Sequence, residues 1–345
     1  MATLKDLSRE TGLSVTQVSR ALGGHADVSE ATRRRVRAAA DRLRYRPNAV
    51  ARALASGRSG IVAVVVSAPD RAEDGALMME IVAGLSAEFS RHGQRFVLHV
   101  LGGESASVAH ERLYREGGID GFVVLDPARG DPRLETLRAI GAPHVVHGRD
   151  PGGDRVFVDI DNRAVAERMA RHLLDLGHRR VGFLNGPDGR GYAMARQDGF
   201  AAALAGAGAT EEEALVHRGE MNEAVGLRVG LSWLTRDRPP TAIVAGNRAL
   251  ASGVYAAARV LDVAIPSQLS VLAHDDGLRA DRARRFDPPL GGTSAQLSEA
   301  WATVARSLAA AIEGERPASA VLDQTFAAGS STAPPTTGRP PSATA

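Results

Sequence analysis

Residues 4–22 read LKDLSRETGLSVTQVSRAL and predict two short helices joined by a tight turn. The first helix covers about residues 4–10, and Thr11-Gly12-Leu13 makes the turn. Ser14 then caps a second helix over 15–22, because its hydroxyl can accept a free amide of the first helical turn. A helix, a three-residue turn with glycine and a capped helix together have the geometry of a DNA-binding helix-turn-helix.

Two further helices are predicted within the first sixty residues. Ser29 caps the third, whose apolar residues recur at the spacing of one buried face, at Val36, Ala39, Ala40 and Leu43. Arg46-Pro47 ends this helix, since the residue before proline disfavours the helical region. Asn48 is expected to cap a short fourth helix over about 49–55.

The charge of the chain is concentrated at one end. Residues 1–60 carry twelve Arg or Lys and five Asp or Glu, a net charge of +7, whereas the other 285 residues carry −5. Such asymmetry indicates a polyanion as partner. With the second helix in a major groove, three side chains would face base edges: Val15, Thr16 and Arg20. Short donors suited to phosphate oxygens are Ser14, Ser19, Ser29 and Thr32. The alternative is a small three-helix interaction domain.

The pattern changes after residue 60. Apolar runs such as Ile61–Val66 and Val181–Leu184 alternate with helical stretches, in two successive series. Such alternation is typical of parallel sheets covered by helices, so an α/β fold with two lobes is predicted. The segment 330–345 is rich in Pro, Ser and Thr and is expected to be disordered.

Composition excludes several classes of protein. The chain has no cysteine, which excludes disulfides, thiolate metal sites and cysteine catalysis. No apolar run approaches the ~18 residues of a membrane span, and the start lacks the features of a signal peptide, so we expect a cytoplasmic protein without membrane contact. Phosphate-loop, dinucleotide and zinc-protease motifs are missing, and the ten histidines are scattered. We therefore expect no catalysis, no cofactor and no metal.

Several strings resemble the LacI/GalR family of repressors. In the first sixty residues they are Thr3-Leu4-Lys5-Asp6-Leu7, residues 12–22, Val28-Ser29-Glu30-Ala31-Thr32-Arg33, Leu43–Asn48 and Ala51-Arg52-Ala53-Leu54. Later ones are Asp161-Asn162, residues 176–180, Arg196–Phe200, His274-Asp275-Asp276 and residues 331–335. The resemblance covers residues 3 to about 335, and its headpiece string is highly specific.

The resemblance implies a domain order. A headpiece over 1–46 is followed by a hinge over 47–59 and a periplasmic-binding-protein-like sensor over 60–329. Chain crossings would divide the sensor into one lobe of about 60–160 and 292–320 and another of 161–291 and 321–329. The family's DNA-contact positions fall on Thr3, Asn48, Ala51 and Leu54, with Leu54 wedged into a minor-groove base step.

The resemblance also implies an effector site between the lobes. Its positions fall on Leu77, Met78, His147, Arg149, Arg196, Asn247 and Asp275. Arg196 could clamp an oxygen-rich or anionic group, and Asp275 could accept hydroxyl donors. The family's cleft carboxylate after Asn247 is replaced here by Arg248, which leaves the effector's identity open.

These features predict a homodimeric transcriptional repressor that binds palindromic operator DNA under the control of a small-molecule effector. The resemblance to the family suggests that this effector is a sugar. One alternative is a small-molecule enzyme on a doubly wound fold with an accessory helical domain. Another is a freestanding binding protein. Neither accounts for the basic headpiece or for Leu54.

Overall fold

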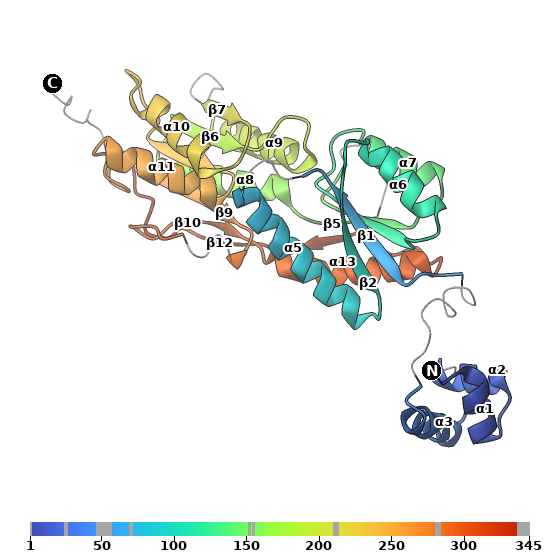
Figure 1. The fold of residues 1–345 in the computed structure, drawn as a ribbon. Helices are drawn as coiled ribbons and strands as arrows, with labels where there is room; N and C mark the ends of the chain where they lie inside the picture. The colour runs from blue at the N-terminus through green and yellow to red at the C-terminus, as the bar shows by residue number, and fades with distance from the viewer. Residues whose placement is uncertain are drawn as a thin grey trace. The chain divides into compact units, whose positions relative to one another are not determined.

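The computed structural model describes residues 2–23, 27–45, 57–68, 72–150, 153, 156–209, 214–279 and 284–336, except for the side chains of 72–77. The chain divides into two compact units, Met1–Ser59 and Gly60–Ala345. The first unit contains helices α1 (Leu4–Thr11), α2 (Val15–Leu22) and α3 (Glu30–Arg42) (Figure 1). The three helices predicted for it are therefore confirmed, and the fourth, over 49–55, lies outside the described residues.

Local hydrogen bonds begin the headpiece helices where the sequence predicts, but α3 ends at Arg42, before the stop expected at Arg46-Pro47, because the chain turns at Arg44 with a φ of 50°. Ser14 accepts from the Gln17 amide at 3.1 Å, and the Gln17 side chain accepts in return from the Ser14 amide. Gly12 ends α1 with φ of 66°, a left-handed conformation that glycine adopts without strain. The helices bury a shared core of Leu7, Val18, Ala21, Val36 and Ala39.

The second unit contains two sheets of six strands each. The first has the order β11-β5-β4-β3-β1-β2, and all its pairs are parallel. Its strands are β1 (Ile61–Val66), β2 (Arg95–Val100), β3 (Gly121–Leu125), β4 (His144–His147), β5 (Phe157–Ile160) and β11 (Ala320–Leu322).

The second sheet has the order β12-β10-β9-β8-β6-β7. Its strands are β6 (Val181–Asn185), β7 (Leu215–Arg218), β8 (Ala242–Ala245), β9 (Ser270–Asp275), β10 (Gly291–Ser294) and β12 (Thr325–Ala327). Only the short β12 runs antiparallel to its neighbour, β10. The predicted α/β class with parallel sheets is confirmed.

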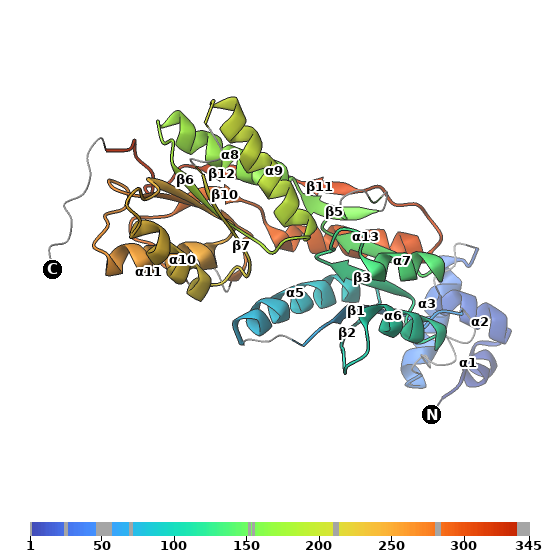
Figure 2. The ribbon, with the colours of Figure 1, turned by 90° about the horizontal axis from the view of Figure 1, so that it is seen from above.

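Helices cover both faces of each sheet, as Figure 2 shows from above. The first sheet packs against α5 (Ala72–Arg91) and α13 (Leu297–Ile312) on one face and α6 (Ala106–Arg115) and α7 (Pro132–Ala139) on the other. The second packs against the pairs α8 (Asn162–Asp175) and α9 (Gly191–Gly206), and α10 (Glu223–Leu234) and α11 (Arg248–Val260). We call each sheet with its helices a lobe.

The chain crosses between the lobes after β5, after β10 and after β11. The lobe boundaries that were expected at about residues 292 and 321 were therefore wrong by a few residues. Strand β10 stays in the second lobe because Gly291–Ser294 pairs with β9, and Ala320–Leu322 stays in the first because it pairs with β5. The last crossing is short, since the chain leaves β11 at Leu322 and enters β12 at Thr325.

The prediction that disorder begins at residue 330 was also wrong. Ser331 is fully buried, and its hydroxyl donates to the Val271 carbonyl at 2.6 Å. The Val271 amide donates to the Ser331 carbonyl at 2.9 Å, so this segment extends the hydrogen bonding of β9. The buried imidazole of His178 also lies 2.9 Å from the Ala333 carbonyl. Residues 337–345 lie outside the described residues.

Candidate functional site

The headpiece presents one polar face of α2. Val18 and Ala21 are buried in its core, which leaves the opposite side of the helix exposed. The residues of α2 and its cap that are predicted to contact DNA are all exposed, namely Ser14, Val15, Thr16, Ser19 and Arg20. Val15 is 40% exposed, so its methyl groups are accessible on this face.

Three predicted DNA-contact residues also cap helices. Thr3 and Ser29 accept from the amides of Asp6 and Thr32, both at 3.3 Å, and Ser14 caps α2 in the same way. Ser29 and Thr32 also share a hydrogen bond of 2.9 Å between their hydroxyls. These bonds hold the first turns of α1, α2 and α3 in fixed positions. Asn48, Ala51 and Leu54 lie outside the described residues.

Arg20 is the cation on the exposed face of α2. Its Nε and Nη2 lie 3.0 and 2.7 Å from one carboxylate oxygen of Asp27. The hydrogen bond and the charge of Asp27 raise the pKa of Arg20 above its ordinary value. Arg20 is therefore a permanently charged donor.

The second unit contains a cavity of about 230 Å³ that residues from both lobes line. It lies at the carboxyl ends of the strands, where ligands bind in parallel α/β sheets. From the first lobe come Ile81, Leu125, Asp126, Pro127, His147, Gly148, Asp159, Ile160, Leu297 and Trp301. From the second come Asn162, Tyr192, Arg196, Met221, Asp276 and Leu278.

Arg196 is the cation of this cavity and is only 4% exposed. Its Nε donates to the Asn162 side-chain oxygen at 2.8 Å, and its Nη1 donates to the Gly246 carbonyl at 2.7 Å. Asn162 in turn donates to Asp159 at 3.0 Å. Because these bonds use two of its three nitrogens, Arg196 is oriented by the protein and has one end left for a ligand.

Two carboxylates of the cavity differ in their environment. Burial raises the pKa of Asp159 to about 6, although Arg149 lies 3.2 Å from it. Burial also favours the neutral form of Asp276, but the nearby His274, Arg196 and His147 outweigh it and lower the pKa of Asp276. Asp276 is therefore the carboxylate best suited to accept hydrogen bonds from hydroxyl groups.

An aromatic wall completes the cavity. Trp301 of α13 is 3% exposed, and its ring lies 5.0 Å from that of His147 at the end of β4. Burial lowers the pKa of His147 to about 4, so its imidazole is neutral at neutral pH. The wall thus offers an apolar face next to an uncharged donor and acceptor.

The structure brings only part of the predicted effector set to this cavity. Of those residues, His147 and Arg196 line it. Met78 is half-buried and does not line it, whereas Ile81, one turn further along α5, does. The side chain of Leu77 lies outside the described residues.

Three other predicted residues hold neighbouring groups in place and do not line the cavity. Asn247 caps α11 and donates to the Met221 carbonyl at 2.8 Å. Asp275 accepts from the Gly277 amide at 2.8 Å and pairs with Arg248 at 3.4 Å. Arg149 pairs with Asp159 and lies over the Phe157 ring.

Sequence reasoning missed several cavity residues. Asp159 lies two positions before Asp161, which the resemblance included, and Asp276 belongs to the matching string His274-Asp275-Asp276, although only Asp275 of that string was assigned to the effector site. Tyr192 lies four positions before Arg196, which is the spacing of one helix face. Trp301 had no such signal, because it comes from a helix far along the chain.

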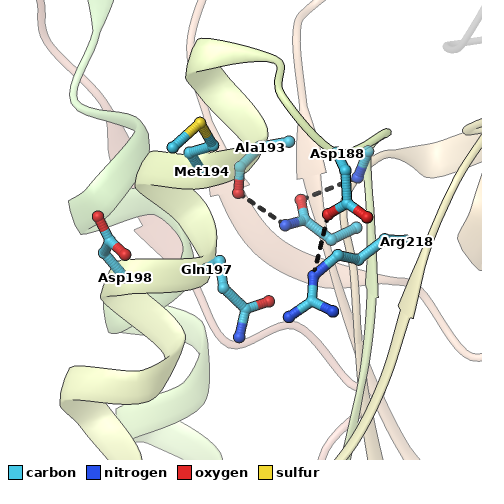
Figure 3. Close-up of a pocket in the computed structure, with 8 residues that line it drawn as sticks. Asp188, Ala193, Met194, Gln197, Asp198 and Arg218 are labelled. Carbon is cyan, nitrogen blue, oxygen red and sulfur yellow. Dashed lines mark hydrogen bonds and ion pairs between the residues drawn. The ribbon is translucent and has the colours of Figure 1, made fainter. Parts of the chain in front are cut away.

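A second cavity, of about 220 Å³, lies on the other side of α9. Figure 3 shows Met194 and Gln197 on that helix, and Asp188 paired with Arg218 at 3.4 Å. The Asn185 side chain, which donates to the Ala193 carbonyl at 2.7 Å, forms its inner wall. Within the described part of the chain, no His, Asp or Glu side chains group as metal ligands, and no helix is long and apolar enough to cross a bilayer.

Comparisons with known proteins match both units. Residues 3–48 match the bacterial regulatory proteins of the lacI family, and residues 170–332 match a periplasmic binding protein-like domain. The HTH-type transcriptional regulator AglR of Rhizobium meliloti is 36% identical over 318 residues, which cover 91% of this chain and 89% of that protein. CelR of Thermobifida fusca, also an HTH-type transcriptional regulator, is 31% identical over 322 residues, covering 91% and 92%.

Solved structures show the same architecture. The complex of the regulator CelR with cellobiose has a TM-score of 0.68 at 28% identity and covers 96% of this chain and 100% of that one. The lac repressor dimer bound to operator and the anti-inducer ONPF has a TM-score of 0.77 and covers 96% and 99%. At 20% identity, the second likeness shows the fold alone.

Proposed function

The chain belongs to the lacI family of bacterial regulatory proteins and is a transcriptional regulator, and from that premise we propose that it represses transcription as a cytoplasmic homodimer on palindromic operator DNA, with its affinity set by an uncharged sugar. The resemblance seen in the sequence is thereby confirmed. The relatives are named as regulators, so the chain is not an enzyme.

The lining of the interlobe cavity is the observation that carries the sugar proposal. A ring with several hydroxyls would donate to Asp276 and Asp159, accept from the remaining end of Arg196, and pack its carbon face against Trp301. An anionic ligand fits less well, because Asp126, Asp159 and Asp276 face it and Arg196 is already held by Asn162 and Gly246. A relative that binds cellobiose supports the same class.

The DNA-binding proposal rests on the exposed face of α2 and the charge of +7 in residues 1–60. Base edges would be contacted by Val15, Thr16 and Arg20, and phosphates by Thr3, Ser14, Ser19, Ser29 and Thr32. Asn48, Ala51 and Leu54 would contact the minor groove, with Leu54 as the wedge.

The test of the sugar proposal is a thermal-shift and calorimetric screen of neutral sugars, with cellobiose and ribose first, against the charged probe glucose 6-phosphate. A bound neutral sugar should raise the melting temperature, because ligand binding stabilises the folded state. Asp276→Asn keeps the shape of the side chain and should weaken the binding of that sugar about tenfold or more.

Asp188→Asn, in the second cavity, is the matched control and should bind the sugar like the wild type. A sugar whose affinity depends on Asp188 and not on Asp276 would place its site behind α9 and contradict the proposal. Tighter binding of glucose 6-phosphate than of any neutral sugar would contradict the ligand class.

A further inference from the structure

We propose that Asp27 is a positioning residue that holds the Arg20 guanidinium in the orientation needed to read guanine, and so sets the base preference of the headpiece. The inference rests on the proposed function, in which Arg20 faces a base edge. Asp27 belongs to none of the groups of residues that the sequence analysis singled out for DNA contact.

The geometry of the pair leaves one edge of Arg20 turned away from Asp27. A planar guanidinium has a lateral edge, Nε with Nη2, and a terminal edge, Nη1 with Nη2. Asp27 Oδ2 takes the lateral edge, at 3.0 Å from Nε and 2.7 Å from Nη2. The terminal edge carries the two parallel N–H groups that match guanine O6 and N7.

Asp27 is itself well placed to act as a support. It precedes Val28, which packs against the headpiece core, and Ser29, whose hydroxyl caps α3. Asp27 therefore lies in the segment that leads into α3, while Arg20 projects from α2. The pair joins the exposed face of α2 to that segment.

An arginine side chain that is held in one orientation before it meets DNA should bind DNA more selectively. A free arginine loses rotamer freedom on binding and can turn its donors toward phosphate or toward other bases. A guanidinium held at its lateral edge keeps less of that freedom, so it favours a bidentate acceptor over a single one. The negative charge of Asp27 also repels phosphates, which lowers affinity for DNA of any sequence. Both effects increase the preference for the specific site.

The experiment uses a duplex that the full-length wild-type protein selects from a randomised DNA library. Companion duplexes change each guanine of the half-sites to adenine, and one duplex has a random sequence. Fluorescence anisotropy at fixed salt gives the guanine-to-adenine affinity ratio at each position. The variants are Arg20→Ala, Asp27→Ala, the double variant, and Glu30→Ala. Glu30 is the matched control, a carboxylate 58% exposed that pairs with Arg33 at 3.4 Å.

Arg20→Ala should abolish the preference at one guanine position. Asp27→Ala should lower the ratio at that position about five- to tenfold, which is part of what a bidentate pair contributes, and should leave binding to random DNA unchanged or tighter. Glu30→Ala should keep the ratio. The double variant should show the same guanine-to-adenine ratio as Arg20→Ala, because Asp27 affects that ratio through Arg20.

Two outcomes would overturn the inference. In the first, Asp27→Ala keeps the wild-type guanine-to-adenine ratio while Arg20→Ala abolishes it. In the second, Asp27→Ala tightens binding to every duplex by the same factor, which would mean that Asp27 acts only by repelling phosphates. A different result, in which Arg20→Ala keeps every base preference, would instead refute the proposed role of Arg20 itself.

Discussion

Two arginines of the molecule are used in opposite ways. Arg20 is 46% exposed and held by a single carboxylate oxygen, so most of its donors face outward. Arg196 is 4% exposed, and neighbouring acceptors hold two of its nitrogens. In the proposed function the first meets a DNA groove, and the second presents one end to a small ligand. Their surroundings, rather than their residue type, make this difference.

Asp159 should make the stability of the protein depend on pH in a predictable direction. Its pKa is raised by burial from 3.8 to about 6, so between these values the folded state binds more protons than the unfolded state. Its contribution to stability therefore falls as pH rises through that window. Asp159→Asn cannot titrate. Its free energy of unfolding relative to the wild type should rise by up to about 3 kcal/mol between pH 3.5 and 7.

The measurement is urea denaturation of both proteins across that pH range. Other titrating groups, including buried histidines such as His110, are common to both proteins and cancel in the difference. A difference that stays constant with pH would show that Asp159 keeps its ordinary acidity and that the cavity is wetter than its burial indicates.

At the scale of residues, prediction from sequence came close to the cavity but often missed by a single position. The aspartates after β9 illustrate why: Asp275 turns to Arg248 and the Gly277 amide, and Asp276 lines the cavity. Which of two adjacent carboxylates points inward depends on backbone direction at the end of a strand, and on the partner Arg248, which is distant in sequence. Neither is visible in a local pattern.

Helix α5 offers a test of how elements pack around the interlobe cavity. A Cβ on Gly84 would lie 2.5 Å from Trp301 Cδ1, so the helix can pass the indole only because residue 84 has no side chain. Gly84→Ala should therefore destabilise the protein by about 1–3 kcal/mol through overpacking, although alanine is normally the better helix former. It should also weaken sugar binding, because Trp301 must move. Chemical denaturation and calorimetry measure the two effects.

Gly206→Ala is the matched control, since Gly206 ends α9 and a Cβ there has nothing within 4 Å. This substitution should be neutral or slightly stabilising and should leave sugar affinity unchanged. Equal stability of the two variants would mean that Trp301 can shift without cost, and that the aromatic wall is looser than its burial implies.

At the scale of elements, prediction succeeded where local chemistry decides the structure. Ser14 and Ser29 cap helices, and apolar runs such as Ile61–Val66 form strands. It failed where long-range pairing decides. Residues 330–336 look disordered by composition, yet Ser331 is buried, and its carbonyl accepts a hydrogen bond from the Val271 amide near the start of β9. Strand β10 begins with Gly291-Gly292, which has no strand signal, and pairing with β9 and β12 keeps it in the second lobe.

At the scale of the whole molecule, we expect a dimer. A palindromic operator presents two equal half-sites, and one chain supplies one headpiece, so two chains are needed for both. Light scattering after gel filtration at micromolar concentration should give about twice the chain mass of 36.2 kDa. A monomeric mass that persists in the presence of operator would contradict this, and a tetrameric mass would imply a further interface.

The two lobes meet around the cavity in a way that a ligand could alter. Apart from the chain crossings, the loop after β3 pairs with the loop before α9, where the Arg129 amide donates to the Gly189 carbonyl at 2.9 Å. In the same contact the Gly191 amide donates to the Pro127 carbonyl at 3.1 Å. A sugar held by Asp276 on one lobe and by Trp301 on the other would favour one lobe angle over others.

Sugar and operator should therefore change each other's affinity by the same factor, since their coupling is a single free energy. The wild type is titrated with the sugar with and without saturating operator, and with operator with and without saturating sugar. Two equal ratios different from one are expected, about fivefold or more. Trp301→Ala should lower sugar affinity and reduce both ratios toward one. Its operator affinity without sugar should stay near the wild-type value, because Trp301 belongs to the second unit and not to the headpiece. Sugar binding that operator does not alter in the wild type would show that the cavity does not control the headpiece.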